Sequence, residues 1–130
     1  MATNTGTPRK PHVLIVDDDI PLAWSFKQTL EHRGLDATIV PDGGLALRFV
    51  VEHPVDAVVC DLEIARLEGD LWFAAVERLN PALARRFIFI TGLGEAAPFQ
   101  KFIDSAALPT LRKPVDLAVL LGEVMRVLKP

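Results

Sequence analysis

The sequence predicts an α/β fold, a doubly wound sheet of five parallel strands with five helices. Two observations predict it: short apolar runs rich in branched residues recur along the chain, and a stretch with helical spacing follows each run. Such alternation favours parallel strands with helices on both faces, and right-handed crossovers make the doubly wound arrangement the default. We expect one domain over residues 12–130, preceded by a flexible N-terminal tail over residues 1–11.

The five strands are predicted where branched and apolar residues cluster. Their ranges are residues 12–16, 35–40, 55–60, 87–90 and 110–112. The run 55–60 is apolar at almost every position, which is typical of a strand that is covered on both faces.

The helices are predicted from apolar residues at helical spacing. Their ranges are residues 21–33, 45–51, 71–79, 98–107 and 117–128. Pro21 suits the first turn of its helix, Gly34 closes that helix, and Asp116 is expected to cap the last one.

Composition excludes several classes of protein. A net charge of −3 without a basic cluster leaves no electrostatic basis for binding nucleic acid. Cys60 is the only cysteine, so no intramolecular disulfide can form, and we expect a small core residue in a reducing compartment. No apolar run approaches the roughly 18 residues of a membrane span, and residues 1–11 lack the apolar core of a signal peptide. We expect a cytoplasmic protein, or the cytoplasmic part of a larger one.

Chemically active side chains follow four of the five predicted strands. They are Asp17, Asp18 and Asp19 after the first strand, Asp61 after the third, Thr91 after the fourth and Lys113 after the fifth. In open parallel sheets ligands bind outside the carboxyl ends of the strands, and these residues share that edge.

These residue types suit phosphoryl transfer. A cluster of carboxylates repels itself unless a cation lies among them, and oxygen ligands suit Mg²⁺. A carboxylate can attack phosphorus, while a metal ion and a lysine neutralise the charge on the transferred oxygens. We therefore predict a phosphoryl site in which Asp17 and Asp18 form the acid pair, Asp61 is the nucleophile, and Thr91 and Lys113 bind the phosphoryl group.

Taken singly, each of these residues has a structural explanation. An Asp after a strand is often a turn residue or a helix N-cap, which is the favoured interpretation of Asp19. Asp61 and Thr91 could begin ordinary loops, and Lys113 could be a solvated lysine. The coincidence of suitable residues at four strand ends favours the phosphoryl site.

The sequence resembles the receiver domain of bacterial two-component response regulators. The likeness covers residues 12–128 and rests on four motifs in order: 12–19 (HVLIVDDD), 56–62 (DAVVCDL), 87–92 (FIFITG) and 111–114 (LRKP). The stretch 87–115 is most similar to receivers fused to hybrid sensor kinases. The resemblance implies a flavodoxin-like sheet with strand order 2-1-3-4-5.

The resemblance also implies a role for each site residue. Asp61 would be the phosphoacceptor and, with Asp17, Asp18 and Glu63, would hold Mg²⁺. Asp18 would bind the ion directly, Asp17 mainly through water, and Glu63 through its backbone carbonyl. Thr91 and Lys113 would bind the phosphoryl group, and the bond before Pro114 is often cis in this family.

The implied partners are a sensor histidine kinase or a histidine phosphotransfer domain, whose phosphohistidine would be the donor. Output would work by docking an unknown partner. By analogy with the family, the docking surface would be the fourth helix, fifth strand and fifth helix, where a homodimer could also form.

The sequence departs from the family pattern around the acceptor. Ala65 stands where a proline is usual, Ile64 and Leu67 replace common methionines, and Arg66 and Glu68 add charge. The Glu63 side chain could crowd the metal or the attacking water, or it could point to solvent.

Two further departures concern phosphate lifetime and readout. Leu93 is apolar and could shield the phosphoryl group, so we predict that Glu63 and Leu93 set the lifetime of the phosphorylated state. Thr110 occupies the position of a switch aromatic, which excludes an aromatic readout there. Output would use backbone shifts or another side chain such as Phe99 or Phe102, although the favoured interpretation of both is as core residues.

Two other functions remain open. A degenerate receiver could act as a binding module that never carries phosphate. A haloacid dehalogenase-type phosphatase would use Asp17 and Asp19 as its D-x-D motif, but Pro21 stands where that motif needs Thr or Val, and no clear cap insertion is present.

Overall fold

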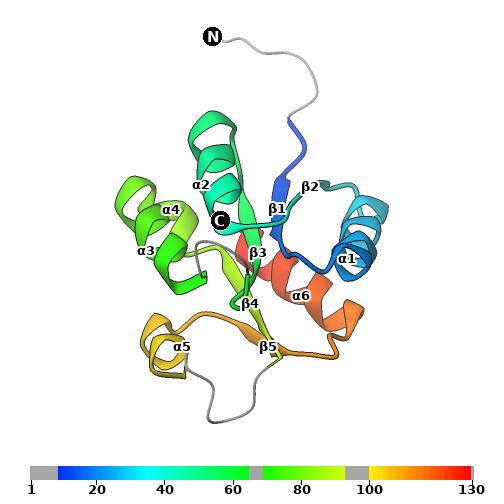
Figure 1. The fold of residues 1–130 in the computed structure, drawn as a ribbon. Coiled ribbons are helices and arrows are strands. Elements are labelled where there is room, and N and C mark those ends of the chain that lie inside the picture. The colour runs from blue at the N-terminus through cyan, green and yellow to red at the C-terminus, as the bar shows by residue number, and fades with distance from the viewer. Residues whose placement is uncertain (1–8, 65–68, 93–99, 130) are drawn as a thin grey trace, which may run out of the picture.

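The computed structural model describes residues 9–64, 69–92 and 100–129. Figure 1 shows strands and helices alternating along the chain, as predicted. In chain order the elements are β1 (His12–Val16), α1 (Ile20–His32), β2 (Asp36–Val40), α2 (Gly43–Glu52), β3 (Ala57–Asp61), α3 (Gly69–Leu79), α4 (Pro81–Ala84), β4 (Phe87–Thr91), α5 (Gln100–Ala106), β5 (Thr110–Arg112) and α6 (Leu117–Leu128).

The five strands form one parallel sheet in the order β2-β1-β3-β4-β5. Each neighbouring pair is parallel and in continuous register, for example Val16 with Cys60 and Asp61 with Ile90. The doubly wound fold and its 2-1-3-4-5 order are thereby confirmed.

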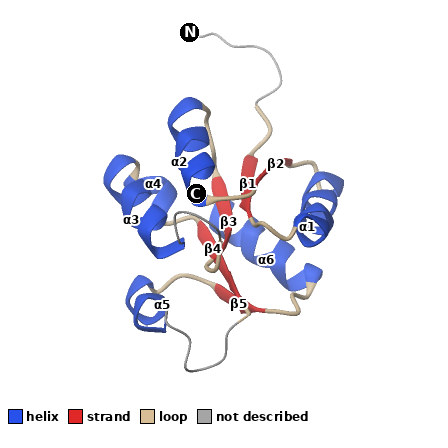
Figure 2. Ribbon diagram, viewed as in Figure 1, coloured by secondary structure: helices blue, strands red, loops and turns tan. Residues whose placement is uncertain are grey.

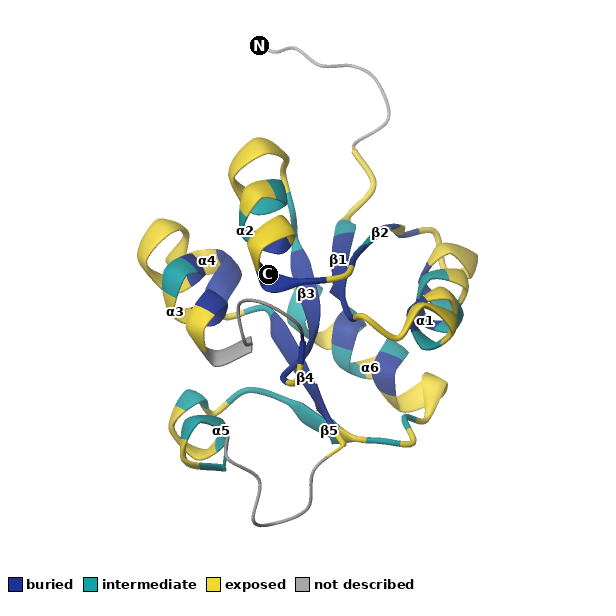
Figure 3. Cartoon of the chain, in the orientation of Figure 1, coloured by how far each residue is buried: buried dark blue, intermediate teal, exposed yellow. Residues whose placement is uncertain are grey.

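Helices cover both faces of the sheet (Figures 1 and 2). Helices α1 and α6 lie on one face, and α2, α3, α4 and α5 lie on the other. Alternate residues of β1 therefore enter two separate cores, Leu14 on the side of α2 and α3, and Val13 on the side of α1 and α6. Figure 3 shows the result: the central strands β1, β3 and β4 are almost wholly buried between helices whose outer surfaces are exposed, and the edge strand β5 is half-buried.

The core beneath α3 is aromatic. Phe73 packs its ring 5.0 Å from Phe87, 5.5 Å from Phe89 and 5.4 Å from Phe102, as measured between ring centroids. Burying one such side chain fully contributes about 1.5–3 kcal/mol. Phe102 is half-buried and packs against the edge of this core, whereas Phe99 lies outside the described residues.

Aspartates and one glycine set the helix ends. Asp19 caps α1 by accepting the Leu22 N–H at 3.2 Å, and Asp116 caps α6 by accepting the Ala118 N–H at 2.8 Å. Gly34 has a φ of +83°, a left-handed conformation that glycine adopts without strain, and it ends the turn after α1. The predicted roles of Asp19, Gly34 and Asp116 are confirmed.

The predicted number of five helices is wrong, because the described residues contain six. The additional one is α4, a single turn with Pro81 in its first position. Asn80 caps it by accepting the Leu83 N–H at 3.1 Å. Four residues are too few to show helical periodicity, so only the Asn-Pro pair signals this helix in the sequence.

Two predicted strand ends also shift. Strands β3 and β4 extend one residue further than predicted, so Asp61 and Thr91 are the last residues of their strands. The ladder carries Asp61 to its pairing with Ile90, and the next amide, Leu62 N–H, donates to the Ile90 carbonyl at 3.0 Å. Strand pairing therefore holds the Asp61 backbone rigidly.

The segment before β1 is tied to the start of β3. Arg9 donates through Nη1 and Nη2, the two terminal guanidinium nitrogens, to Asp56, at 2.9 and 3.1 Å. The predicted boundary between tail and domain stays a prediction, since residues 1–8 lie outside the described part. Among the described helices, none has the length and apolar character needed to cross a bilayer.

Candidate functional site

The carboxyl edge of the sheet collects the residues that the sequence singled out. Asp17 and Asp18 directly follow β1, Asp61 ends β3, Thr91 ends β4, and Lys113 directly follows β5. Parallel strands bring these five residues to one edge. The loops that follow the strands there create the space in which an open α/β sheet binds its ligand.

Asp61 is held by two donors. Lys113 Nζ lies 2.8 Å from Asp61 Oδ2, and the Glu63 backbone N–H donates to Asp61 Oδ1 at 2.8 Å. The Asp61 side chain is only 2% exposed, whereas the Lys113 side chain is 30% exposed, so the carboxylate end of this ion pair is shielded from water. Burial on its own would lower the pKa of Lys113, but the hydrogen bond and charge of Asp61 raise it above its ordinary value. The lysine is therefore held in its charged form.

Asp17 lies beside this pair in a less favourable setting. Its Oδ1 accepts the Asp19 N–H at 2.8 Å, while its Oδ2 is buried and has no hydrogen-bond partner among the described residues. Burial raises the pKa of Asp17 to about 6; the Asp19 N–H opposes that rise and the charge of Asp61 adds to it. A buried carboxylate oxygen without a donor is costly, which indicates a site that a cation would complete.

The acid cluster has the donor atoms of a metal site. Asp17, Asp18 and Asp61 each offer an oxygen, and the three atoms lie within 4.8 Å of one another. Asp18 is exposed, so the cluster opens to water on one side. Carboxylate oxygens with access to water fit a hard divalent cation, and the unpartnered Asp17 oxygen supports that fit.

Glu63 lies at the edge of this cluster with its carboxylate turned elsewhere. Its Oε1 accepts the backbone N–H of Gly92 at 3.1 Å, so the side chain crosses from the end of β3 to the loop after β4. This contact was not predicted: the sequence left open whether the side chain crowds the site or points to solvent. The role of the Glu63 carbonyl as a metal ligand stays a prediction.

Thr91 and Lys113 are joined through the backbone. The Thr91 carbonyl accepts the Lys113 N–H at 2.9 Å, which fixes the end of β5 beside the end of β4. The Thr91 side chain is buried, and the Lys113-Pro114 bond is cis, as the family resemblance implied. Thr110, the expected site of a switch aromatic, is half-buried and donates its hydroxyl to the Leu108 carbonyl at 3.3 Å.

Cys60 is a buried neighbour of Asp61, as predicted. Trp72 donates its indole N–H to Cys60 Sγ at 3.1 Å, which links α3 to the strand that ends in the acceptor. Sequence reasoning missed this contact, because nothing in the sequence pairs residues twelve apart across a strand and a helix.

Several positions singled out in the sequence lie outside the described residues. They are Ala65, Arg66, Leu67, Glu68 and Leu93. Ile64, the last described residue before the first gap, is buried.

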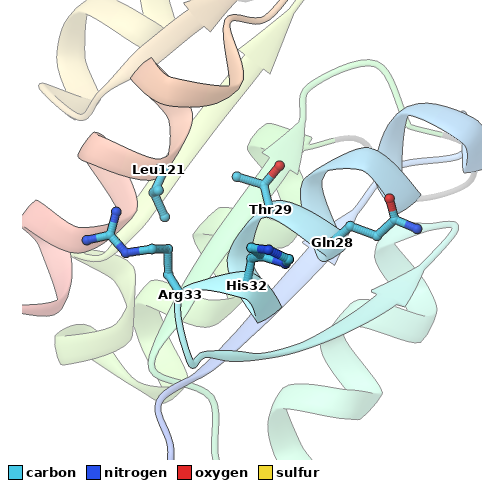
Figure 4. A pocket seen from close by; sticks show the side chains of 5 residues that line it. All are labelled: Gln28, Thr29, His32, Arg33 and Leu121. Atoms are coloured by element: carbon cyan, nitrogen blue, oxygen red, sulfur yellow. The ribbon is translucent and has the colours of Figure 1, made fainter.

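A groove of about 400 Å³ lies away from the acid cluster (Figure 4). Its lining residues come from α1, the residue after α1 and α6: Gln28, Thr29, His32, Arg33 and Leu121. They include no carboxylate, and those from α1 lie in its second half, whereas Asp17 and Asp18 precede its first turn. The groove therefore has no part in the site.

Comparisons with known proteins agree with this geometry. The family model described as the response regulator receiver domain matches residues 13–125. The transcriptional regulatory protein ZraR of Escherichia coli (strain K12) is 29% identical over 104 residues, covering 80% of this chain and 23% of that protein. The regulator RpaA of Synechocystis is 26% identical over 119 residues, covering 92% of this chain and 49% of RpaA. The chain thus spans about a quarter to a half of these relatives.

Solved structures give the same result. A CheY-like response regulator receiver domain from Methanospirillum hungatei JF-1 superposes with a TM-score of 0.82 at 26% identity, covering 92% of this chain and 94% of that one. A sensor protein from Polaromonas sp. JS666 gives a TM-score of 0.79 at 27% identity, with 93% and 97% covered. The strand order, the acid cluster at the carboxyl edge and the match over residues 13–125 lead to one conclusion: the chain belongs to the response regulator receiver domain family.

Proposed function

We propose that this receiver domain accepts a phosphoryl group on Asp61 from a phosphohistidine and thereby changes its affinity for an output partner. The observation that carries the proposal is the setting of Asp61. It is a buried carboxylate paired with Lys113 at 2.8 Å, beside a second buried carboxylate, Asp17, one of whose oxygens has no partner in the described part of the chain. A structural ion pair would not need the further acids.

The reaction is a displacement at phosphorus. An Asp61 carboxylate oxygen attacks the phosphorus atom, the bond from phosphorus to the donor nitrogen breaks, and the leaving imidazole keeps that electron pair and takes up a proton. The product is an acyl phosphate on Asp61. Lys113, held charged, would balance the negative charge of the transferred oxygens, and the Thr91 hydroxyl would follow them.

Mg²⁺ is the proposed cofactor, held by Asp17, Asp18, Asp61 and the Glu63 carbonyl. When bound, it would neutralise charge on the phosphoryl oxygens. The protein contributes the fixed carboxylates: strand β3 holds Asp61 in register, and the Asp19 N–H orients Asp17.

The partners are proposed from the family and from the exposed surface. The donor is a sensor histidine kinase or a histidine phosphotransfer domain in the cytoplasm. The output surface is α5, β5 and α6, the elements that correspond to the predicted fourth helix, fifth strand and fifth helix. On α6, Leu117 and Val119 are 37% and 48% exposed, which suits docking or a homodimer.

The lifetime of the acyl phosphate is proposed to depend on Glu63 and Leu93. Glu63→Asn and Leu93→Ala should each change the rate of dephosphorylation. Unchanged rates in both variants would remove this part of the proposal.

The test is to incubate the chain with acetyl phosphate and Mg²⁺ and to weigh it. The expected result is a mass gain of one phosphoryl group that is lost in Asp61→Asn and in the presence of a chelator. No gain in the unchanged protein would favour the phosphate-independent binding module. Turnover of a phosphate ester would favour the phosphatase, although Asp19, which that mechanism needs, is engaged as the N-cap of α1.

A further inference from the structure

Glu63 contacts the end of the acceptor's own strand, β3, and the residue that follows the neighbouring strand β4. Its backbone N–H donates to Asp61 Oδ1 at 2.8 Å, and its side-chain Oε1 accepts the Gly92 N–H at 3.1 Å. The β3–β4 register pairs Asp61 with Ile90, so Glu63 and Gly92 each lie two residues beyond that pair. The side chain therefore bridges the ends of two neighbouring strands.

The bridge lies close to the lysine that pairs with Asp61. A Cβ on Gly92 would lie 3.4 Å from Glu63 Oε1 and 3.5 Å from Lys113 Cδ, so both side chains lie within van der Waals reach of this position. A negatively charged carboxylate thus lies beside Lys113 and in front of a backbone donor while Asp61 is unmodified.

A phosphoryl group on Asp61 would need the same donors. It carries close to two negative charges and three acceptor oxygens, and it gains stability from the N–H groups and cations around it. The Gly92 N–H follows Thr91 at the end of the neighbouring strand, and the Glu63 carboxylate holds it. The two anions would also repel each other next to one lysine.

We propose that the Glu63 carboxylate is an internal competitor of the phosphoryl group: it binds the Gly92 N–H in the unmodified domain and must leave when Asp61 is loaded. The inference rests on the proposed function of Asp61 and adds a residue that controls how easily loading occurs. Glu63 acts here as a positioning residue, because its side chain contacts neither the nucleophilic oxygen of Asp61 nor the molecule that donates the phosphoryl group.

The expected size of the effect is modest. Glu63 is exposed, so water can replace the Gly92 N–H as its partner. Losing one hydrogen bond of this kind should lower the acetyl phosphate concentration needed for half-maximal loading by about 3- to 10-fold.

The first measurement uses the unmodified protein without Mg²⁺ or phosphodonor. Proton–nitrogen correlation spectra and amide exchange report on the Gly92 N–H directly. Glu63→Ala should shift the Gly92 signal and speed its exchange, whereas Glu63→Gln, which keeps an oxygen acceptor, should change it less. Glu77→Gln removes the same charge from an exposed position in the last turn of α3 and serves as the matched control.

The second measurement follows loading by mass across a series of acetyl phosphate concentrations with Mg²⁺ present. Glu63→Ala should load most easily, Glu63→Gln should lie between it and the unchanged protein, and Glu77→Gln should match the unchanged protein. An unaltered Gly92 signal in Glu63→Ala would overturn the inference. Equal loading by Glu63→Ala and the unchanged protein would overturn it too, as would equal gains in the Ala and Gln variants, because the effect would then be charge alone.

The two levels of the proposal fail differently. An unchanged protein that gains no mass contradicts the proposed function, and the competition falls with it. An unchanged protein that loads normally, together with any of the three contrary results above, overturns the competition alone.

Discussion

Strand β3 has a carboxylate at each end, and the two carboxylates have opposite electrostatic surroundings. Asp56, just before the strand, accepts hydrogen bonds from the two terminal guanidinium nitrogens of Arg9 and from the His12 backbone N–H, the last at 2.7 Å. Asp61, at the other end, shares its surroundings with Asp17 and Asp18 and pairs with Lys113. Among the described residues, Asp56 is surrounded by donors and positive charge, whereas Asp61, Asp17 and Asp18 are three acids grouped beside Lys113.

The pKa values differ in the same sense. Burial on its own would raise the pKa of Asp56, but the Arg9 and His12 hydrogen bonds hold it below its ordinary value. Burial raises the pKa of Asp17 to about 6, and the charge of Asp61 contributes to the rise. A buried carboxylate whose oxygens accept hydrogen bonds stabilises the fold. One with an oxygen that accepts none destabilises the fold, and a bound cation can remove that destabilisation.

The largest effect on stability is expected from Asp56→Ala. The change removes the acceptor of the His12 N–H and of Arg9, and it should lower the free energy of unfolding by about 1–3 kcal/mol, as measured by urea denaturation. Mg²⁺ should stabilise this variant as much as it stabilises the unchanged protein. An unchanged free energy of unfolding would show that the hydrogen bonds of Asp56 with Arg9 and His12 do not stabilise the fold.

A smaller effect of opposite sign is expected from Asp17→Asn. In chelator, neutralising this crowded acid should raise the free energy of unfolding by on the order of 1 kcal/mol. The stabilisation by added Mg²⁺ should be largely lost. Asp36→Asn, at an exposed position on β2, is the charge-matched control and should show neither change. A lower free energy of unfolding in Asp17→Asn would contradict the view that repulsion among Asp17, Asp18 and Asp61 destabilises the domain without a cation.

The pH dependence of stability should separate the two clusters. Asp17 has a raised folded pKa, so its contribution is fully present below the ordinary value of 3.8 and is lost as the pH rises to about 6. Asp56 has a lowered pKa, so its contribution is present above 3.8 and is lost as the pH falls below that value. In chelator, the unchanged protein should lose stability as the pH rises from 3.8 to about 6, and Asp17→Asn should remove this loss. Asp56→Asn should weaken the dependence of stability on pH below 3.8. Identical profiles for the two variants would contradict the comparison.

The smallest effect is expected from Arg9→Gln. The Arg9 side chain is 51% exposed, so its ion pair with Asp56 should contribute only about 0.2–1 kcal/mol to the free energy of unfolding, and less at high salt. The His12 N–H keeps its bond to Asp56 in this variant. A decrease in the free energy of unfolding as large as that of Asp56→Ala would show that Arg9, and not the His12 N–H, provides most of the stabilisation at Asp56.

The sequence allowed most of this fold to be predicted, because strand ends and helix caps are local signals. Asp61 and Thr91 lie where their strands end, and Asp116 caps α6, as expected. Helix α4 was not predicted, because a single helical turn is too short to show periodicity in the sequence.

The long-range contacts were not predictable in the same way. The bonds from Trp72 to Cys60, from Arg9 to Asp56 and from Gly92 to Glu63 join residues 12, 47 and 29 positions apart. Each depends on where a side chain turns after the sheet has formed. The acid cluster could be inferred because parallel strands align their ends, but the direction of the Glu63 side chain could not.

The central claim is that Asp61, among all these carboxylates, carries the phosphoryl group. The most direct test is to load the protein with acetyl phosphate and Mg²⁺, reduce it with borohydride, which converts an aspartyl phosphate into homoserine, and sequence the peptides by mass. The account predicts homoserine at position 61, with Asp17, Asp18 and Asp56 unaltered. Homoserine at any of those three positions, or none at 61, would contradict it.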